Sequence, residues 1–206
     1  MASHNDIVVD QFTRQAAPFA EAPAIREEEA LRLLVEFSGA GASDSVLDVA
    51  CGPGLVVAEF AKVCRHATGI DLTPAMIDQA RQHAAALRLA NVDWRVGDVT
   101  ALPFADMSFS VVVSRFAFHH FVDPLVVLRE MARVATRRVV VADIAASDDP
   151  TRAAALNRME KLRDPSHTRA LPLSGLRALF AEAGLPEPRV THYDVRADLD
   201  RLLAIT

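Results

Sequence analysis

Short apolar runs alternate with amphipathic stretches along most of the 206-residue chain. The apolar runs are short and rich in β-branched residues, which is typical of buried strands. We expect strands at 45–49, 66–70, 92–96, 109–114 and 138–142. The stretches with helical periodicity predict helices at 25–38, 55–63, 73–89, 124–135 and 174–183. Residues 1–24 contain two prolines, and we expect them to form a loose segment with at most one short helix.

This alternation of strand and helix predicts the fold class. Consecutive parallel strands need a crossover connection, which is usually a helix, so the pattern favours a mostly parallel sheet with helices on both faces. We therefore expect a doubly wound α/β fold. In such a sheet, ligands bind beyond the carboxyl ends of the strands, where the strand order reverses.

Composition and charge narrow the function classes. Hydrophobic residues make up 51% of the chain and charged residues 24%, so the chain can bury a core. The net charge of -5 lacks the basic excess of nucleic-acid-binding proteins, and we expect no nucleic-acid partner. Cys51 and Cys64 are too few for a disulfide framework. Without a leader-like start or an apolar run that could span a membrane, we expect a cytoplasmic protein.

The turn after the first strand is the strongest candidate for a ligand site. It reads Asp-Val-Ala-Cys-Gly-Pro-Gly at 48–54, and Gly52 and Gly54 allow the backbone to approach a ligand closely. Asp71 ends the second strand and Asp98 ends the third. A carboxylate at 71 can accept both hydroxyls of a ribose, and one at 98 can accept the amino group of an adenine. Together these features predict a ligand that contains adenosine.

Other adenosine-containing ligands fit the turn less well. The turn that binds nicotinamide dinucleotides has a third glycine, where this chain has Val57. The Gly-x-x-x-x-Gly-Lys-Ser/Thr run of a P-loop does not occur. Asp48 precedes the turn, where its charge disfavours a pyrophosphate and suits a cation such as an amino group or a sulfonium.

The combined motifs resemble those of the class I S-adenosylmethionine-dependent methyltransferases, in the branch that contains the ubiquinone/menaquinone biosynthesis enzymes and many small-molecule enzymes. The motifs are those at 48–54, 69–72, 97–99, 102–104, 116–120 and 163–167. The resemblance implies one Rossmann-like domain over 1–206. Within it, we expect an N-terminal helical lid at 1–40, a cofactor-binding core at 41–146, and a substrate-side segment and sheet edge at 147–206.

The resemblance also implies S-adenosyl-L-methionine as cofactor and S-adenosyl-L-homocysteine as product. The residues it assigns to the methionine half and the methyl region are Asp48, Ala50, Cys51, Gly52, Gly54, Ser114 and Arg115. The residues it assigns to the ribose and the adenine are Asp71, Leu72, Met76, Asp98 and Val99. Phe12 and Phe19 are expected to cover the site as part of the lid.

One position departs from the family pattern. The family's usual Asp-x-Gly-x-Gly turn has a glycine where this chain has Ala50. Alanine tolerates a positive φ poorly. We therefore expect Ala50 to adopt an ordinary backbone conformation and cofactor binding to be retained.

Three histidines are candidate catalytic residues. His119 and His120 follow the fourth strand, and His167 ends the 163–167 motif. The pKa of histidine suits it for taking a proton from a methyl acceptor. The alternatives are packed histidines that shape their loops, or a metal site that includes Asp123. Since no third ligand stands at a recognisable spacing, we assign no metal.

The expected activity is in-line transfer of a methyl group to a carbon, oxygen or nitrogen atom of a small molecule. The alternatives are a non-catalytic regulatory protein that binds S-adenosylmethionine and a nicotinamide-dependent oxidoreductase. Residues 189–195 predict the first strand of a C-terminal hairpin, but no apolar final strand follows. We expect an incomplete sheet edge, and, because exposed edges invite pairing, a homodimer formed through it.

Overall fold

Five parallel strands form the centre of the protein in the computed structural model, which describes residues 2–20 and 26–195. The strands lie in the order β3-β2-β1-β4-β5, and each neighbouring pair is parallel. Their bounds are Ser45–Val49 (β1), His66–Asp71 (β2), Val92–Val96 (β3), Phe109–Arg115 (β4) and Ala135–Ala142 (β5). All five predicted strands are present, and the doubly wound α/β fold is confirmed.

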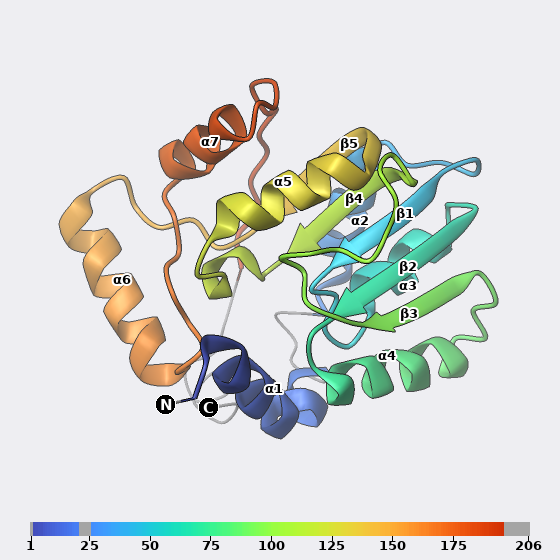
Figure 1. The fold of residues 1–206 in the computed structure, drawn as a ribbon, viewed down its shortest axis with the longest axis horizontal. Helices are drawn as coiled ribbons and strands as arrows, with labels where there is room; N and C mark the ends of the chain where they lie inside the picture. Colours follow the sequence, from blue (N-terminus) through green and yellow to red (C-terminus); the bar gives the residue numbers. More distant parts are fainter. Residues whose placement is uncertain (1, 21–25, 196–206) are drawn as a thin grey trace.

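Helices cover both faces of this sheet (Figure 1). Val46 and Leu47 are consecutive in β1, so their side chains point to opposite faces and belong to separate hydrophobic cores. The core around Val46 contains residues of α2 (Glu28–Ser38), α3 (Leu55–Ala61) and α4 (Pro74–Ala86). The core around Leu47 contains residues of α5 (Pro124–Val134) and α7 (Leu173–Glu182).

The strand order creates a crevice between β1 and β4. The chain adds β2 and β3 on one side of β1, and then β4 and β5 on the other. The loops that follow β1 and β4 therefore diverge at the carboxyl ends of these strands. Asp48 pairs in register with Val113, so the 48–54 turn and Arg115 meet at this crevice. Figure 1 shows α1 and α6 beyond the same ends of the strands.

The N-terminal segment is more regular than expected. Instead of a loose start, residues His4–Ala20 form one continuous helix, α1. Pro18 lies in its last turn, where the missing N–H removes only one hydrogen bond. α1 packs against α4, and this tertiary contact stabilises a helix whose sequence contains a helix breaker.

A second helix, α6 (Pro150–Arg163), was also not expected. Its start carries an ordinary signal, because the Asp149 carboxylate accepts hydrogen bonds from the amides of Thr151 and Arg152. Glu160 is the one buried residue along this helix. The helix therefore lacks the apolar stripe by which amphipathic helices are recognised.

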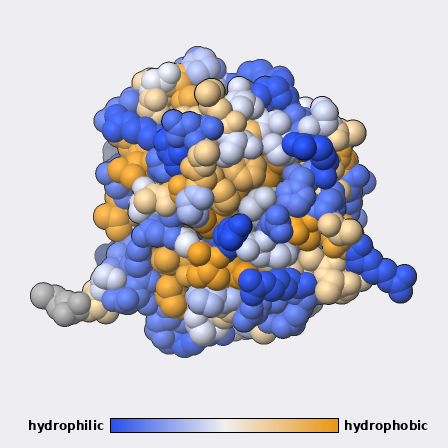
Figure 2. Space-filling view, turned by 45° about the vertical axis from the view of Figure 1, so that its right-hand side comes forward, coloured by the Kyte–Doolittle hydropathy of each residue, from blue (hydrophilic) through white to orange (hydrophobic). Residues whose placement is uncertain are grey.

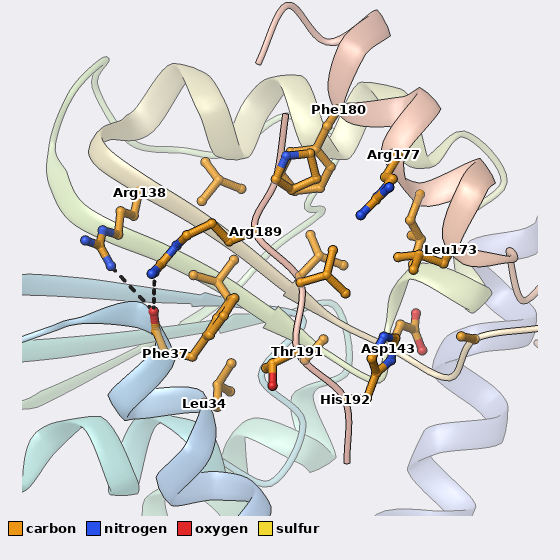
Figure 3. Close-up of a pocket in the computed structure, with 18 of the residues that line it drawn as sticks. Leu34, Phe37, Arg138, Asp143, Leu173, Arg177, Phe180, Arg189, Thr191 and His192 are labelled. Atoms are coloured by element: carbon orange, nitrogen blue, oxygen red, sulfur yellow. Dashed lines mark hydrogen bonds between the residues drawn. The ribbon is translucent and has the colours of Figure 1, made fainter. Parts of the chain in front are cut away.

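The strand predicted at 189–195 is wrong, because the tail from 185 to 195 has no secondary structure. A cavity of about 900 Å³ separates this tail from β5, with α2 and α7 at its sides (Figure 3). Arg189 of the tail and Arg138 of β5 both donate to the carbonyl oxygen of Phe37, at 3.2 and 3.4 Å. The bond from Arg189 holds the tail against the end of α2. Since the tail stands off from β5, β5 is the outermost strand among the described residues.

Hydrophobic side chains also reach the surface. On the face drawn in Figure 2 they lie among many hydrophilic side chains. Within the described ranges, we find no helix that is both long enough and apolar enough to cross a membrane.

Candidate active site

A cavity of about 230 Å³ lies beyond the carboxyl ends of the strands and is partly lined by α1. The predicted residues that line it are Asp48, Ala50, Cys51, Gly52, Asp71, Leu72, Met76, Asp98, Val99, Arg115 and His120, with Phe12 and Phe19 of the expected lid. The predicted residues outside its lining are Gly54, Ser114, His119 and His167. The larger cavity beside β5 contains none of the acids at 48, 71 and 98. The smaller cavity is therefore the candidate active site.

The 50–54 turn is built from residues with positive φ. The φ angles are 59° at Ala50, 50° at Gly52 and 80° at Gly54. The expectation of an ordinary conformation at Ala50 is wrong. The amide of Cys51, the next residue, donates to the carbonyl of Ile70 on β2 at 3.0 Å, and this bond fixes the turn. The left-handed conformation of an alanine costs about 1–2 kcal/mol, which the surrounding structure offsets.

Gly54 serves packing rather than the cavity. A Cβ atom added to Gly54 would lie 2.5 Å from the ring of Trp94 and 2.8 Å from the Cβ atom of Ala80. A Cβ atom added to Gly69 of β2 would lie 2.7 Å from the ring of Trp94 and 2.7 Å from the Sγ atom of Cys51. The two glycines therefore let the turn, β2, β3 and α4 approach one another closely.

Cys51 is held as a neutral thiol. It is buried, and burial raises the pKa of its thiol well above the ordinary value. The charges of Asp71 and Asp48 raise it further. A thiolate is the nucleophilic form of cysteine, so this residue is suited to lining the turn and not to nucleophilic chemistry.

Asp71 organises the turn through both carboxylate oxygens. Its Oδ2 accepts from the amide of Gly52 and its Oδ1 from the amide of Thr73, each at 2.8 Å. Burial raises the pKa of this carboxyl, and these amide bonds oppose the rise. Each oxygen retains a lone pair for a further donor, so the side chain can also bind a diol.

Asp48 is the least satisfied polar group of the cavity. It is 2% exposed, and neither of its carboxylate oxygens has a hydrogen-bond partner among residues 2–20 and 26–195. Burial raises the pKa of Asp48 well above its usual range, the charge of Asp71 adds to the rise, and Arg115 opposes it. A buried carboxylate without donors is costly, and a bound cation would satisfy it.

Asp98 connects the third strand to α1. Its Oδ1 accepts from the amide and the hydroxyl of Thr100 at 2.8 and 2.7 Å, and its Oδ2 accepts from the side-chain amide of Asn5 at 2.8 Å. Burial raises the pKa of Asp98, but the hydrogen bonds outweigh burial and the net shift is downward. Asp98 therefore remains a carboxylate at the rim of the cavity.

Two residues at the end of β4 behave differently from each other. The Ser114 hydroxyl donates to the carbonyl of Val49 at 2.8 Å and is fully buried, so it joins β4 to β1 and does not reach the cavity. Arg115 lines the cavity, and its guanidinium lies 4.2 Å from the ring centre of Phe116. Phe116 has a φ of 56°, which bends the chain sharply where the strand ends.

The three candidate histidines lie together, although only His120 lines the cavity. The ring centres of His119 and His120 are 4.2 Å apart, and that of His167 is 5.4 Å from His119. Burial and then the neighbouring His119 lower the pKa of His120 to about 3, so its ring is neutral near pH 7. The described ranges hold no group of three or more metal-binding side chains placed to bind an ion.

Sequence reasoning missed the partner of His119. Asp143 lies at the end of β5, and its Oδ1 is 2.6 Å from the Nδ1 atom of His119. Its Oδ2 also accepts from the backbone amide of His119 at 3.0 Å. The available signal was a single acid that interrupts the apolar run at 139–146.

Sequence reasoning also missed two polar residues of α1. The Nε2 atom of His4 donates to the carbonyl of His120 at 2.7 Å, and Asn5 donates to Asp98. The Phe12 ring meets the His120 ring edge-on, with ring centres 5.0 Å apart. These contacts tie the first helix to the loops that follow β3 and β4.

Comparisons with known proteins give four matches. Residues 47–142 match the family model of a methyltransferase domain. The Bacillus subtilis protein named "Uncharacterized methyltransferase YcgJ" is 33% identical over 172 residues, which are 82% of this chain and 68% of that protein. A crystal structure of YcgJ matches with a TM-score of 0.82 at 30% identity, covering 86% of this chain and 77% of that one. The ubiquinone/menaquinone biosynthesis C-methyltransferase UbiE of Roseobacter denitrificans is 40% identical over 96 residues, which are 45% of this chain and 38% of that enzyme.

Proposed function

Because the chain belongs to the class I S-adenosylmethionine-dependent methyltransferases, we propose that it methylates a small-molecule acceptor in the cavity under α1. The acceptor atom in this proposal is a carbon, an oxygen or a nitrogen. The name of the UbiE relative supports a small molecule as acceptor.

The observation that carries the proposal is the state of Asp48. Its two carboxylate oxygens are buried at the cavity, and no residue that the structure describes donates a hydrogen bond to them. The amino group of the cofactor's methionine half is a cation with three N–H donors, and it would satisfy this carboxylate. The negative charge of Asp48 therefore fits the cationic methionine half of the cofactor. A nicotinamide dinucleotide would place its pyrophosphate there, and Asp48 would repel it.

The remaining cofactor contacts follow from the same placement. Asp71 would hold the ribose hydroxyls, since both its oxygens retain free lone pairs. Asp98 and Val99 would meet the polar edge of the adenine, and Leu72 and Met76 would flank its faces. Ala50, Cys51 and Gly52 would surround the methionine half. Arg115 also belongs to this region of the cavity.

The cofactor supplies a methyl group activated by attachment to a sulfonium, so the protein needs no nucleophile of its own. The chain holds both reactants in one small cavity, which raises their effective concentration. α1 covers the cavity and limits the access of water. His120 offers a ring that is neutral near pH 7. Because a pKa of about 3 makes this ring a weak base, it would take a proton only as the acceptor oxygen bonds to the methyl carbon, when that proton becomes strongly acidic. His119 and His167 lie behind His120 and are proposed to support it.

Calorimetric titration with S-adenosylmethionine and S-adenosylhomocysteine tests the cofactor site. We expect binding of both, a loss of affinity of at least tenfold in Asp71→Ala, and no change in the control Asp78→Asn. Asp78 is an exposed acid on α4 whose partner is Arg81. The absence of heat with both compounds, or an unchanged affinity in Asp71→Ala, would refute the assignment.

Transfer of an isotopically labelled methyl group to a panel of small phenols, amines and quinols tests the catalytic part. Tight cofactor binding without transfer to any acceptor would favour the regulatory alternative. Titration with nicotinamide dinucleotides addresses the oxidoreductase alternative, for which we expect no binding at the 48–54 turn.

A further inference from the structure

The proton on the His120 ring can be located from its neighbours. The Ser166 hydroxyl donates to Oδ1 of Asp164 at 2.5 Å, and its oxygen lies 3.0 Å from Nδ1 of His120. A hydroxyl has one hydrogen, so toward His120 it can only accept. Nδ1 of His120 therefore carries the proton, and Nε2 carries the lone pair. Among the described residues Nε2 has no hydrogen-bond partner, and the ring lines the cavity, so this lone pair can serve a ligand.

This chain of groups is rigid. Ser166 and Asp164 are 0% and 3% exposed. Oδ1 of Asp164 also accepts from the backbone amide of Ser166 at 2.8 Å, which fixes the carboxylate. His4 bonds the carbonyl of His120, and the edge contact with Phe12 limits rotation of the ring. The tautomer and the direction of the ring are thus both determined before any ligand binds.

The residues that line the cavity with His120 indicate which kind of methyl acceptor it suits. Besides the groups proposed for the cofactor, much of the cavity wall is apolar, with Val8, Phe12, Phe19, Phe121 and Val122. Apolar walls and one bare ring nitrogen suit an apolar molecule that presents a single hydrogen-bond donor. An amine attacks with a lone pair that is already free. A hydroxyl becomes a good nucleophile only as it gives up its proton, so the bare nitrogen helps a hydroxyl most.

We propose that the methyl acceptor carries a weakly acidic hydroxyl on an apolar ring, that Nε2 of His120 takes this proton during transfer, and that Ser166 and Asp164 are positioning residues for His120. The inference rests on the proposed function. In the step, the hydroxyl oxygen forms the bond to the methyl carbon, and the carbon–sulfur bond breaks with its electron pair staying on sulfur. The hydroxyl proton moves to Nε2, so the positive charge passes from sulfur to the imidazole ring. The ring then returns its proton to water when the methyl ether leaves.

The tautomer can be measured without an acceptor, by long-range proton–nitrogen NMR on protein labelled with ¹⁵N-histidine. The His120 signals are assigned by their loss in His120→Phe. We expect the proton on Nδ1 in the unmodified protein, and a shift toward the Nε2–H form in Ser166→Ala but not in the control Ser108→Ala. Ser108 is a serine whose hydroxyl donates to a backbone carbonyl in an exposed loop. A proton on Nε2 in the unmodified protein would overturn the inference.

Binding of phenol and of anisole to the protein saturated with S-adenosylhomocysteine tests the acceptor. Anisole has a methyl group in place of the hydroxyl hydrogen of phenol, so it cannot donate a hydrogen bond. We expect phenol to bind about threefold to tenfold more tightly, the range of one hydrogen bond, and the preference to vanish in His120→Phe. Equal binding of the two probes by the unmodified protein would overturn the hydroxyl acceptor. Binding of S-adenosylhomocysteine is measured first. Equal binding of the two probes would therefore refute the hydroxyl acceptor without refuting the cofactor site.

Discussion

Replacing Asp48 with asparagine is expected to stabilise the protein without cofactor and to weaken cofactor binding. The carboxyl is buried without a donor in the described part of the chain, and its pKa is raised well above the usual range, first by burial and then by Asp71. An acid whose pKa is higher in the folded state than in the unfolded state destabilises the fold as pH rises through the folded-state pKa. Asparagine has the same shape but no charge, so it removes this penalty near pH 7.

The magnitudes follow from the surroundings of Asp48. The asparagine amide would also be buried without a partner, so we expect a net gain of only about 1 kcal/mol in the free energy of unfolding. For a chain of this size that gain corresponds to a rise in Tm of about 2–4 °C. A charged hydrogen bond from the cofactor's amino group contributes about 1.5–3 kcal/mol, so its loss lowers affinity about tenfold to 150-fold.

Thermal unfolding with and without saturating S-adenosylhomocysteine, together with calorimetric titration, measures both effects. Asp78→Asn on the surface of α4 is the matched control and should change neither. The advantage of Asp48→Asn should shrink as pH is lowered, because Asp48 then gains its proton and its own penalty disappears. A lower Tm for Asp48→Asn without ligand, or an unchanged affinity, would refute the reasoning.

Three further predictions concern the packing of Gly54, the attachment of α1 and the outer edge of the sheet. Gly54→Ala should lower the free energy of unfolding by about 2–4 kcal/mol in urea titrations, because φ strain adds to the clash with Trp94. Gly184→Ala has a similar φ but open space around the new Cβ, so a loss equal to that of Gly54→Ala would contradict the clash. Asn5→Ala should lower cofactor affinity about twofold to tenfold and speed proteolysis of α1, since one hydrogen bond to Asp98 is lost. The outer edge of β5 should support self-association in sedimentation velocity runs, and a monomer at every concentration would count against it.

The strands and the turn at 48–54 were predictable because their signals are local. β1 is a short, mostly buried strand that is followed by a glycine turn, and Asp71 is the last residue of a second such strand. Elements whose stability depends on distant contacts were missed. α1 contains Pro18 and owes its regularity to packing on α4, and α6 buries only Glu160. The predicted strand at 189–195 fails for the same reason, because a strand depends on a neighbour that its own residues do not reveal.

The same distinction holds inside the site. Residues that face the cavity come from contiguous motifs, so sequence reasoning found Asp48, Asp71 and His120. The groups that decide how His120 can act lie far from it in the sequence, since Ser166 follows it by 46 residues. His119 likewise receives its orientation from Asp143, 24 residues away. A histidine motif therefore indicates where a proton acceptor stands, whereas the nitrogen that carries the lone pair is decided by tertiary contacts. In the mechanism that we propose, Nε2 of His120 has no partner among the described residues, and the choice of acceptor depends on Ser166 and Asp164, which need not touch the substrate.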